Sequence, residues 1–143
     1  MTKRRAQLVI AAVFGISLIA QLAIVVVLGN QDKMWDNEQL SLITKLLTIY
    51  SVPLGVIFFG MVASARSRSA GKRQPLGLIA LAFVLVWNIL FVARCLRLAL
   101  APHDSVSSAL SYYEAISSNG SWLIAGVLTL FFAARDTAEK PTA

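Results

Sequence analysis

One apolar run, residues 76–100, carries two arginines inside its final turns. It reads LGLIALAFVLVWNILFVARCLRLAL and is long enough to cross a bilayer, which takes about 20 apolar residues. Arg94 and Arg97 stay charged at any physiological pH, so inside a membrane each must reach the headgroups, meet a carboxylate or face a wet cavity. The run therefore predicts a membrane-spanning helix whose neighbours compensate positive charge.

The rest of the chain is apolar enough for three more spans. Of its 143 residues, 57% are hydrophobic and only 14% are charged, whereas soluble domains average about half and about a quarter. We therefore expect an all-α integral membrane protein, a four-transmembrane-helix bundle with up-down-up-down topology. Residues 1–143 would form one domain, with spans over residues 6–29, 39–64, 76–100 and 108–134.

The start of the chain, with Lys3, Arg4 and Arg5 before an apolar run, also resembles the start of a signal peptide. The apolar region of a signal peptide is about 7 to 15 residues long and ends at a cleavage site of small residues. Residues 6–29 form a longer run without such a site. We interpret this run as an uncleaved first span.

Basic residues gather on one side of the predicted bundle. The loop 65–75 contains four of them and no acid, and together with the two chain ends it accounts for nine of the 13 Lys and Arg residues. Short basic loops stay in the cytoplasm, so both termini are predicted to be cytoplasmic, in the inner membrane of a bacterium. The net charge of +6 favours contact with anionic membrane lipids. Since the loop lacks interleaved aromatic residues, we expect no nucleic-acid partner.

Three charged residues fall at a similar depth within their predicted helices, and we call them the charge layer: Lys45, Arg94 and Glu114. Each lies about 10 Å below the outer surface at about 1.5 Å per residue. Glu114 can pair with Lys45 or Arg94, while Arg97, one turn nearer the surface, can snorkel or reach Asp104.

Two interpretations of the charge layer stay open. It is either an interhelical ion pair with spare cations snorkelling outward, or a pocket for an anionic headgroup, a carboxylate ligand or an acidic residue of a partner. Proton transfer by Glu114 ranks below pairing, because nearby cations favour the charged form of a carboxylate.

Small polar residues recur at intervals of three and four in the second and fourth spans, which puts them on one face of each helix. We predict polar stripes at Thr44, Thr48 and Ser51 and at Ser117 and Ser121. Asn88 in the third span is expected to hydrogen-bond to a neighbouring helix.

Two positions predict bends. Pro53 removes a backbone hydrogen bond in the middle of the second span, and Gly120 follows Asn119 in a dipeptide typical of turns. A break at Gly120 would leave a final segment of only about 20 Å, too short to cross, so we expect a continuous fourth helix. Each bend either shapes the bundle or acts as a hinge.

The residue content argues against catalysis. With one Cys and one His, the chain has too few ligands for its own zinc site or for bis-His haem ligation, so we expect no metal and no cofactor. Glu114 has no His and no second carboxylate in the spans to act with it, so we expect no catalytic residue and no enzyme activity.

Two functions remain. The first is a non-enzymatic membrane protein that associates with itself or serves as an accessory subunit of a larger membrane complex, with the charge layer holding the bundle. The alternative is a transporter or channel protomer with an outward-facing polar pocket for a small or amphiphilic solute, with anionic solutes among the candidates. The expected partners are membrane lipids and either further copies of the chain or a larger membrane protein.

Overall fold

The protein consists of four helices in a computed structural model that describes residues 3–31, 33–66, 76–101 and 104–133. These helices are α1 (Lys3–Asn30), α2 (Asp36–Arg66), α3 (Leu76–Leu100) and α4 (Val106–Ala133), and the described residues contain no strand. All four are long and apolar enough to cross a membrane. The prediction of an all-helical protein with four candidate spans is therefore confirmed, and each helix end lies within three residues of its predicted place.

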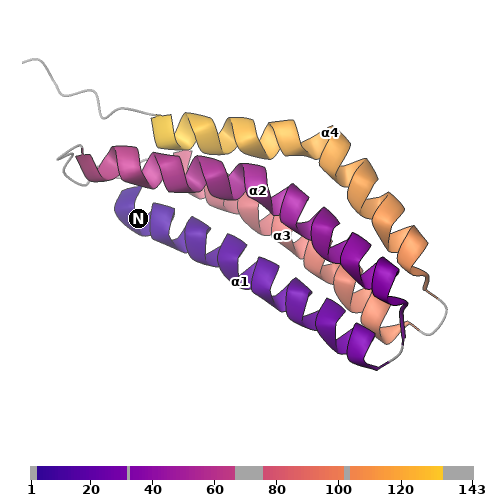
Figure 1. Cartoon of the computed structure of the whole chain (residues 1–143). Coiled ribbons are helices and arrows are strands. Elements are labelled where there is room, and N and C mark those ends of the chain that lie inside the picture. Colours follow the sequence, from indigo (N-terminus) through magenta and orange to yellow (C-terminus); the bar gives the residue numbers. More distant parts are fainter. Residues whose placement is uncertain (1–2, 32, 67–75, 102–103, 134–143) are drawn as a thin grey trace, which may run out of the picture.

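The helices surround a common interior. Helix α1 packs against α2 and α3, and α4 packs against the same two helices, so α1 and α4 occupy opposite sides of the bundle (Figure 1). The end of α1 and the start of α2 lie at the same end of the bundle as the end of α3 and the start of α4 (Figure 1). We call this the connection end.

Aromatic side chains fill the interior near the middle of the helices. The ring of Tyr50 makes edge contacts with Phe14 and Phe91, at centroid distances of 5.9 and 6.4 Å. Phe91 also stacks on Tyr113 at 5.4 Å. All four side chains are buried. Because lipid tails are as apolar as a protein interior, it is close packing of this kind, together with polar contacts, that holds membrane helices together.

Helices α2 and α4 both bend part-way along their length (Figure 1). Pro53 is buried inside α2 and explains the bend there, since its nitrogen cannot donate to the preceding turn. Helix α4 continues through Asn119 and Gly120 without a break, as predicted. A Cβ atom at Gly120 would lie 2.7 Å from the ring of Trp87, so glycine at this position lets α4 approach α3 closely.

Polar caps begin two of the helices at the connection end. The Trp35 backbone N–H donates to Glu38 Oε2 at 3.0 Å, and the Ser108 N–H donates to Ser105 Oγ at 3.2 Å. Both contacts satisfy donors that a helix start leaves unpaired. Most of the basic loop 65–75 and the C-terminal basic residues Arg135 and Lys140 lie outside the described residues.

Candidate functional site

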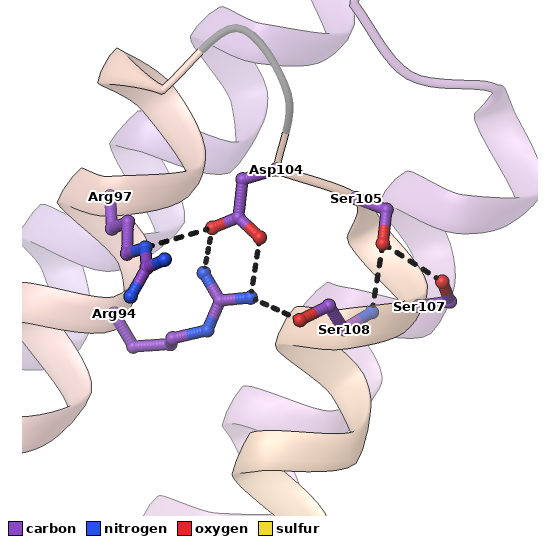
Figure 2. A network of polar contacts seen from close by, with 6 residues as sticks. All are labelled: Arg94, Arg97, Asp104, Ser105, Ser107 and Ser108. Atoms are coloured by element: carbon purple, nitrogen blue, oxygen red, sulfur yellow. Dashed lines mark hydrogen bonds and ion pairs between the residues drawn. The ribbon is translucent and has the colours of Figure 1, made fainter.

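Arg94 lies at the centre of a polar cluster at the connection end, formed by Arg94, Arg97, Asp104 and Ser108 (Figure 2). Its guanidinium binds both carboxylate oxygens of Asp104, with Nη2 2.9 Å from Oδ1, and Nη2 also donates to Ser108 Oγ at 3.0 Å. The guanidinium carbon lies 5.8 Å from the centre of the Tyr112 ring, within range of a cation–π contact. The cluster thus joins the end of α3 to the start of α4.

The two arginines of the cluster differ in burial. The side chains of Arg94 and Asp104 are only 8% and 10% exposed, whereas that of Arg97 is 75% exposed and its Nε lies 3.8 Å from Asp104 Oδ2. The hydrogen bonds from Arg94 hold the pKa of the Asp104 carboxyl below its usual value, against the effect of burial, and the charges of both arginines act in the same direction. Arg94 is thus the principal partner of Asp104, and Arg97 is a weaker, exposed one.

Glu114 pairs with Lys45 rather than with Arg94. Lys45 Nζ lies 3.6 Å from Glu114 Oε1, with the two side chains 28% and 73% exposed. The sequence left open which cation Glu114 would meet, and the structure joins it to Lys45 across the α2–α4 contact. The predicted charge layer therefore divides into two ion pairs, because Asp104 occupies Arg94.

The predicted polar stripes do not meet in the interior. Thr44, Thr48 and Ser51 are exposed on α2, and Ser117 and Ser121 are half-buried on α4. Several of these hydroxyls donate to carbonyls of their own helix: Thr48 to Thr44 O at 2.8 Å, Ser51 to Thr48 O at 2.7 Å and Ser117 to Glu114 O at 3.1 Å. The α2 stripe therefore lies on the outer surface of the bundle.

A buried polar network, which we define as Ser17, Gln21, Tyr50 and Asn88, does lie inside. Gln21 Nε2 donates to the Tyr50 hydroxyl at 2.6 Å, and this hydroxyl donates to Asn88 Oδ1 at 3.0 Å. Ser17 Oγ lies 3.0 Å from the same hydroxyl. Tyr50 of α2 therefore links α1 to α3, the helix across the bundle. The predicted helix–helix bond of Asn88 is formed here.

Sequence reasoning missed the α1 half of this network. The available signal was the spacing of Ser17 and Gln21, two polar residues four apart in an apolar span, which puts them on one face. Three buried polar atoms near the interior have no hydrogen-bond partner among the described residues: Gln21 Oε1, Trp87 Nε1 and Tyr113 Oη.

Within the described parts of the four helices, no three His, Cys, Asp or Glu side chains form a group that could hold a metal ion. The sequence and the fold were also compared with known proteins. No protein family, curated protein or solved structure matches this chain. Its function must therefore be inferred from its own residues.

Proposed function

We propose that this protein is a small, non-enzymatic membrane subunit that acts by packing against other chains within the bilayer. The observation that carries the proposal is the position of its intramembrane polar groups. Buried groups such as Tyr50 and Asn88 bond to one another, although three buried polar atoms lack a partner among the described residues. Other polar groups, such as Ser51 and Asn119, are exposed on the outside of the helices. Polar groups exposed to hydrocarbon favour contact with another protein surface.

The same distribution makes a transport path within one protomer the weaker candidate. The rings of Phe14, Tyr50 and Phe91 are fully buried and occupy the middle of the bundle. Arg94, the most buried cation among the described residues of the charge layer, is already bound to Asp104. An anionic solute would have to displace that carboxylate, so the cluster is better suited to fixing helix ends than to accepting a ligand.

The proposed orientation is an up-down-up-down bundle with both termini cytoplasmic and the connection end outward, in the inner membrane of a bacterium. Arg4 and Arg5 are exposed in the first turn of α1, and the start of α1 lies at the end of the bundle opposite to the connection end (Figure 1). In the sequence, the basic loop 65–75 joins the second and third helices, which puts it on the same side as the start of the chain in an up-down bundle. Fusions of a periplasm-active phosphatase after residue 70 and after residue 103 test this orientation. The proposal expects activity only for the second fusion, and activity for the first would contradict it.

Purification of the full chain in a mild detergent tests the function. We expect either a homo-oligomer by mass or a stable complex with a second membrane protein, and no solute flux when the protein is reconstituted in liposomes. A monomer without a partner would contradict the proposal. Flux of a small anion that is lost in Arg94→Gln would favour the transporter instead.

A further inference from the structure

The Lys45–Glu114 ion pair is incomplete within one chain, unlike the Arg94–Asp104 pair. The Arg94 guanidinium binds both carboxylate oxygens of Asp104, and both side chains are enclosed by the bundle. The Glu114 side chain, in contrast, is 73% exposed, and its carboxylate meets only Lys45. The Lys45–Glu114 pair therefore lies on the outside of the bundle.

The charged groups of Lys45 and Glu114 keep unused hydrogen-bonding capacity. Their contact of 3.6 Å is longer than an ordinary hydrogen bond of at most about 3.2 Å, and neither group forms a hydrogen bond with the described residues. The two residues lie nine and eight positions after the starts of their candidate spans, about 12–14 Å at about 1.5 Å per residue. Charges at such a depth are normally paired and hydrogen-bonded, so this pair favours a further polar partner.

The surface around the pair differs from the surfaces of the other two helices. Every exposed side chain within residues 8–28 of α1 and 77–96 of α3 is apolar, which suits contact with lipid tails. Beside the pair, the positions three or four residues away on α2 and α4 are exposed hydroxyl residues that share a helix face with it. We call this patch the α2–α4 surface: Ser41, Lys45, Thr48, Ser111, Glu114 and Ser118.

We propose that the α2–α4 surface binds the same surface of a second copy of this chain, so that each Lys45 faces Glu114 of the other copy. Two copies inserted in the same orientation and related by a two-fold axis along the membrane normal place equivalent residues at the same depth. Across that axis, α2 of one copy faces α4 of the other. The two ion pairs then form a ring of four charges that alternate in sign.

Charge complementarity favours a second copy over an anionic lipid as the occupant of this surface. A phosphate headgroup would attract Lys45 but would repel the Glu114 carboxylate beside it. A second copy supplies a cation for Glu114 and an anion for Lys45 at the right depth. This inference rests on the proposed function and names the partner.

Charge reversal in two co-expressed chains tests whether the contact forms between copies. Full-length chains with two different affinity tags are extracted in mild detergent, one tag is captured and the other is measured. Lys45→Glu paired with itself leaves only acids at the four positions, and Glu114→Lys paired with itself leaves only bases. Co-purification of the second tag should fall about tenfold in both cases. Undiminished co-purification would overturn the inference.

The decisive combination is Lys45→Glu in one chain with Glu114→Lys in the other. Opposite charges then face each other between the copies, while like charges meet inside each copy. Co-purification should return to near the wild-type level, and an ion pair that acts only within one chain predicts no recovery. Absence of recovery would therefore contradict the dimer. Arg4→Glu is the control, because it reverses an exposed charge at the start of α1 and should change nothing.

Thiol crosslinking in native membranes tests the same contact without reversed charges. The single natural cysteine, Cys95, is buried and is first replaced by Ser. A chain with Lys45→Cys is co-expressed with a differently tagged chain with Glu114→Cys, and a short bis-maleimide should give a band of twice the monomer mass that carries both tags. Replacing the first chain by Ile16→Cys, on the exposed surface of α1, should give no such band. Equal bands, or none in either case, would overturn the inference.

The wild-type chain separates this inference from the proposed function. A wild-type chain that co-purifies with a second membrane protein but not with its own tagged copy would overturn the dimer and leave the subunit function standing. A wild-type monomer with no partner would overturn both.

Discussion

Lys45 Nζ lies 3.6 Å from Glu114 Oε1, at a place where α2 and α4 touch. The pair neutralises two charges that would each be costly alone inside a membrane. It also sets the relative height of two helices that are not consecutive in the chain. Arg94 of α3 binds Asp104, in the connection before α4, and Ser108 in the first turn of α4, so α4 is tied to α2 by an ion pair and to α3 by the contacts of Arg94.

Reversal of the Lys45–Glu114 pair tests whether the contact stabilises the bundle. Lys45→Glu and Glu114→Lys should each lower the free energy of unfolding because each places like charges together. The double variant should recover about 0.5–1 kcal/mol of coupling, the usual range for an ion pair with an exposed partner. The free energy of unfolding is measured in mixed detergent micelles for the wild type, the two single variants and the double variant. The pairing would be contradicted if the free energy of unfolding of the double variant equalled the value obtained by adding the losses of the two single variants.

Tyr50→Phe tests the buried polar network. The change keeps the ring contacts with Phe14 and Phe91 and removes the hydroxyl that Gln21 and Asn88 bind. Gln21 Nε2 keeps its bonds to Ser17 and Asn88 Nδ2 keeps its bond to Val84 O, but Asn88 Oδ1 loses its donor. The loss should cost about 1–2 kcal/mol of unfolding free energy.

The matched control for this change is Tyr112→Phe, which keeps the ring beside Arg94 and touches no member of the network. It should change stability by less than about 0.5 kcal/mol. Equal effects of the two substitutions would show that the network contributes nothing specific.

Arg94 and Arg97 are the same residue type and both contact Asp104, but only Arg94 is buried. Substituting each in turn therefore shows how burial changes the contribution of an ion pair. Arg94→Gln leaves the enclosed Asp104 carboxylate without its main partner and should destabilise the bundle by about 3–5 kcal/mol. Arg97→Gln removes an exposed partner at 3.8 Å and should cost less than about 1 kcal/mol. The free energies of unfolding of the two variants, measured in the same micelles, show which arginine contributes more to stability. A larger loss for Arg97 would contradict the assignment of Arg94 as the principal partner.

Asp104 should make stability depend on acid pH. Because its pKa is lowered in the folded protein, its contribution is fully present above the unfolded pKa of about 3.9 and is lost as pH falls through the lower folded value. The unfolding midpoint should therefore drop in strongly acid buffer. Asp104→Asn should be less stable near pH 7 and should lose this part of the acid dependence. An unchanged acid profile in Asp104→Asn would contradict the linkage.

Much of the fold follows from hydropathy alone, because a bilayer admits few structures. Apolar runs of spanning length must be helices, since hydrocarbon offers no partner for backbone groups. This is why the four helices could be predicted to within three residues at each end. The continuity of α4 through Gly120 also followed from length, although Asn119-Gly120 is a turn signal in water.

The side-chain partners were harder to predict, because they depend on which helices are neighbours. The sequence gives the depth of Glu114 but not whether α2 or α3 faces it. Arg97 does reach the loop residue Asp104, as predicted, but the closer partner of Asp104 is Arg94, which sequence reasoning did not pair with it. Likewise, the contact from Tyr50 to Asn88 crosses the bundle, and no helical periodicity reveals a contact between opposite helices.

Energy transfer between labelled copies in lipid vesicles is the most direct test of lateral association through polar surfaces. Full-length protein is labelled separately with donor and acceptor, mixed, and reconstituted at increasing lipid-to-protein ratios. For the wild type, energy transfer should stay above the random-encounter level as the lipid-to-protein ratio rises. For Lys45→Glu, transfer should reach the random-encounter level at a smaller lipid-to-protein ratio than for the wild type. Transfer that matches random encounter at every dilution in wild-type protein, in the absence of any other protein, would contradict self-association.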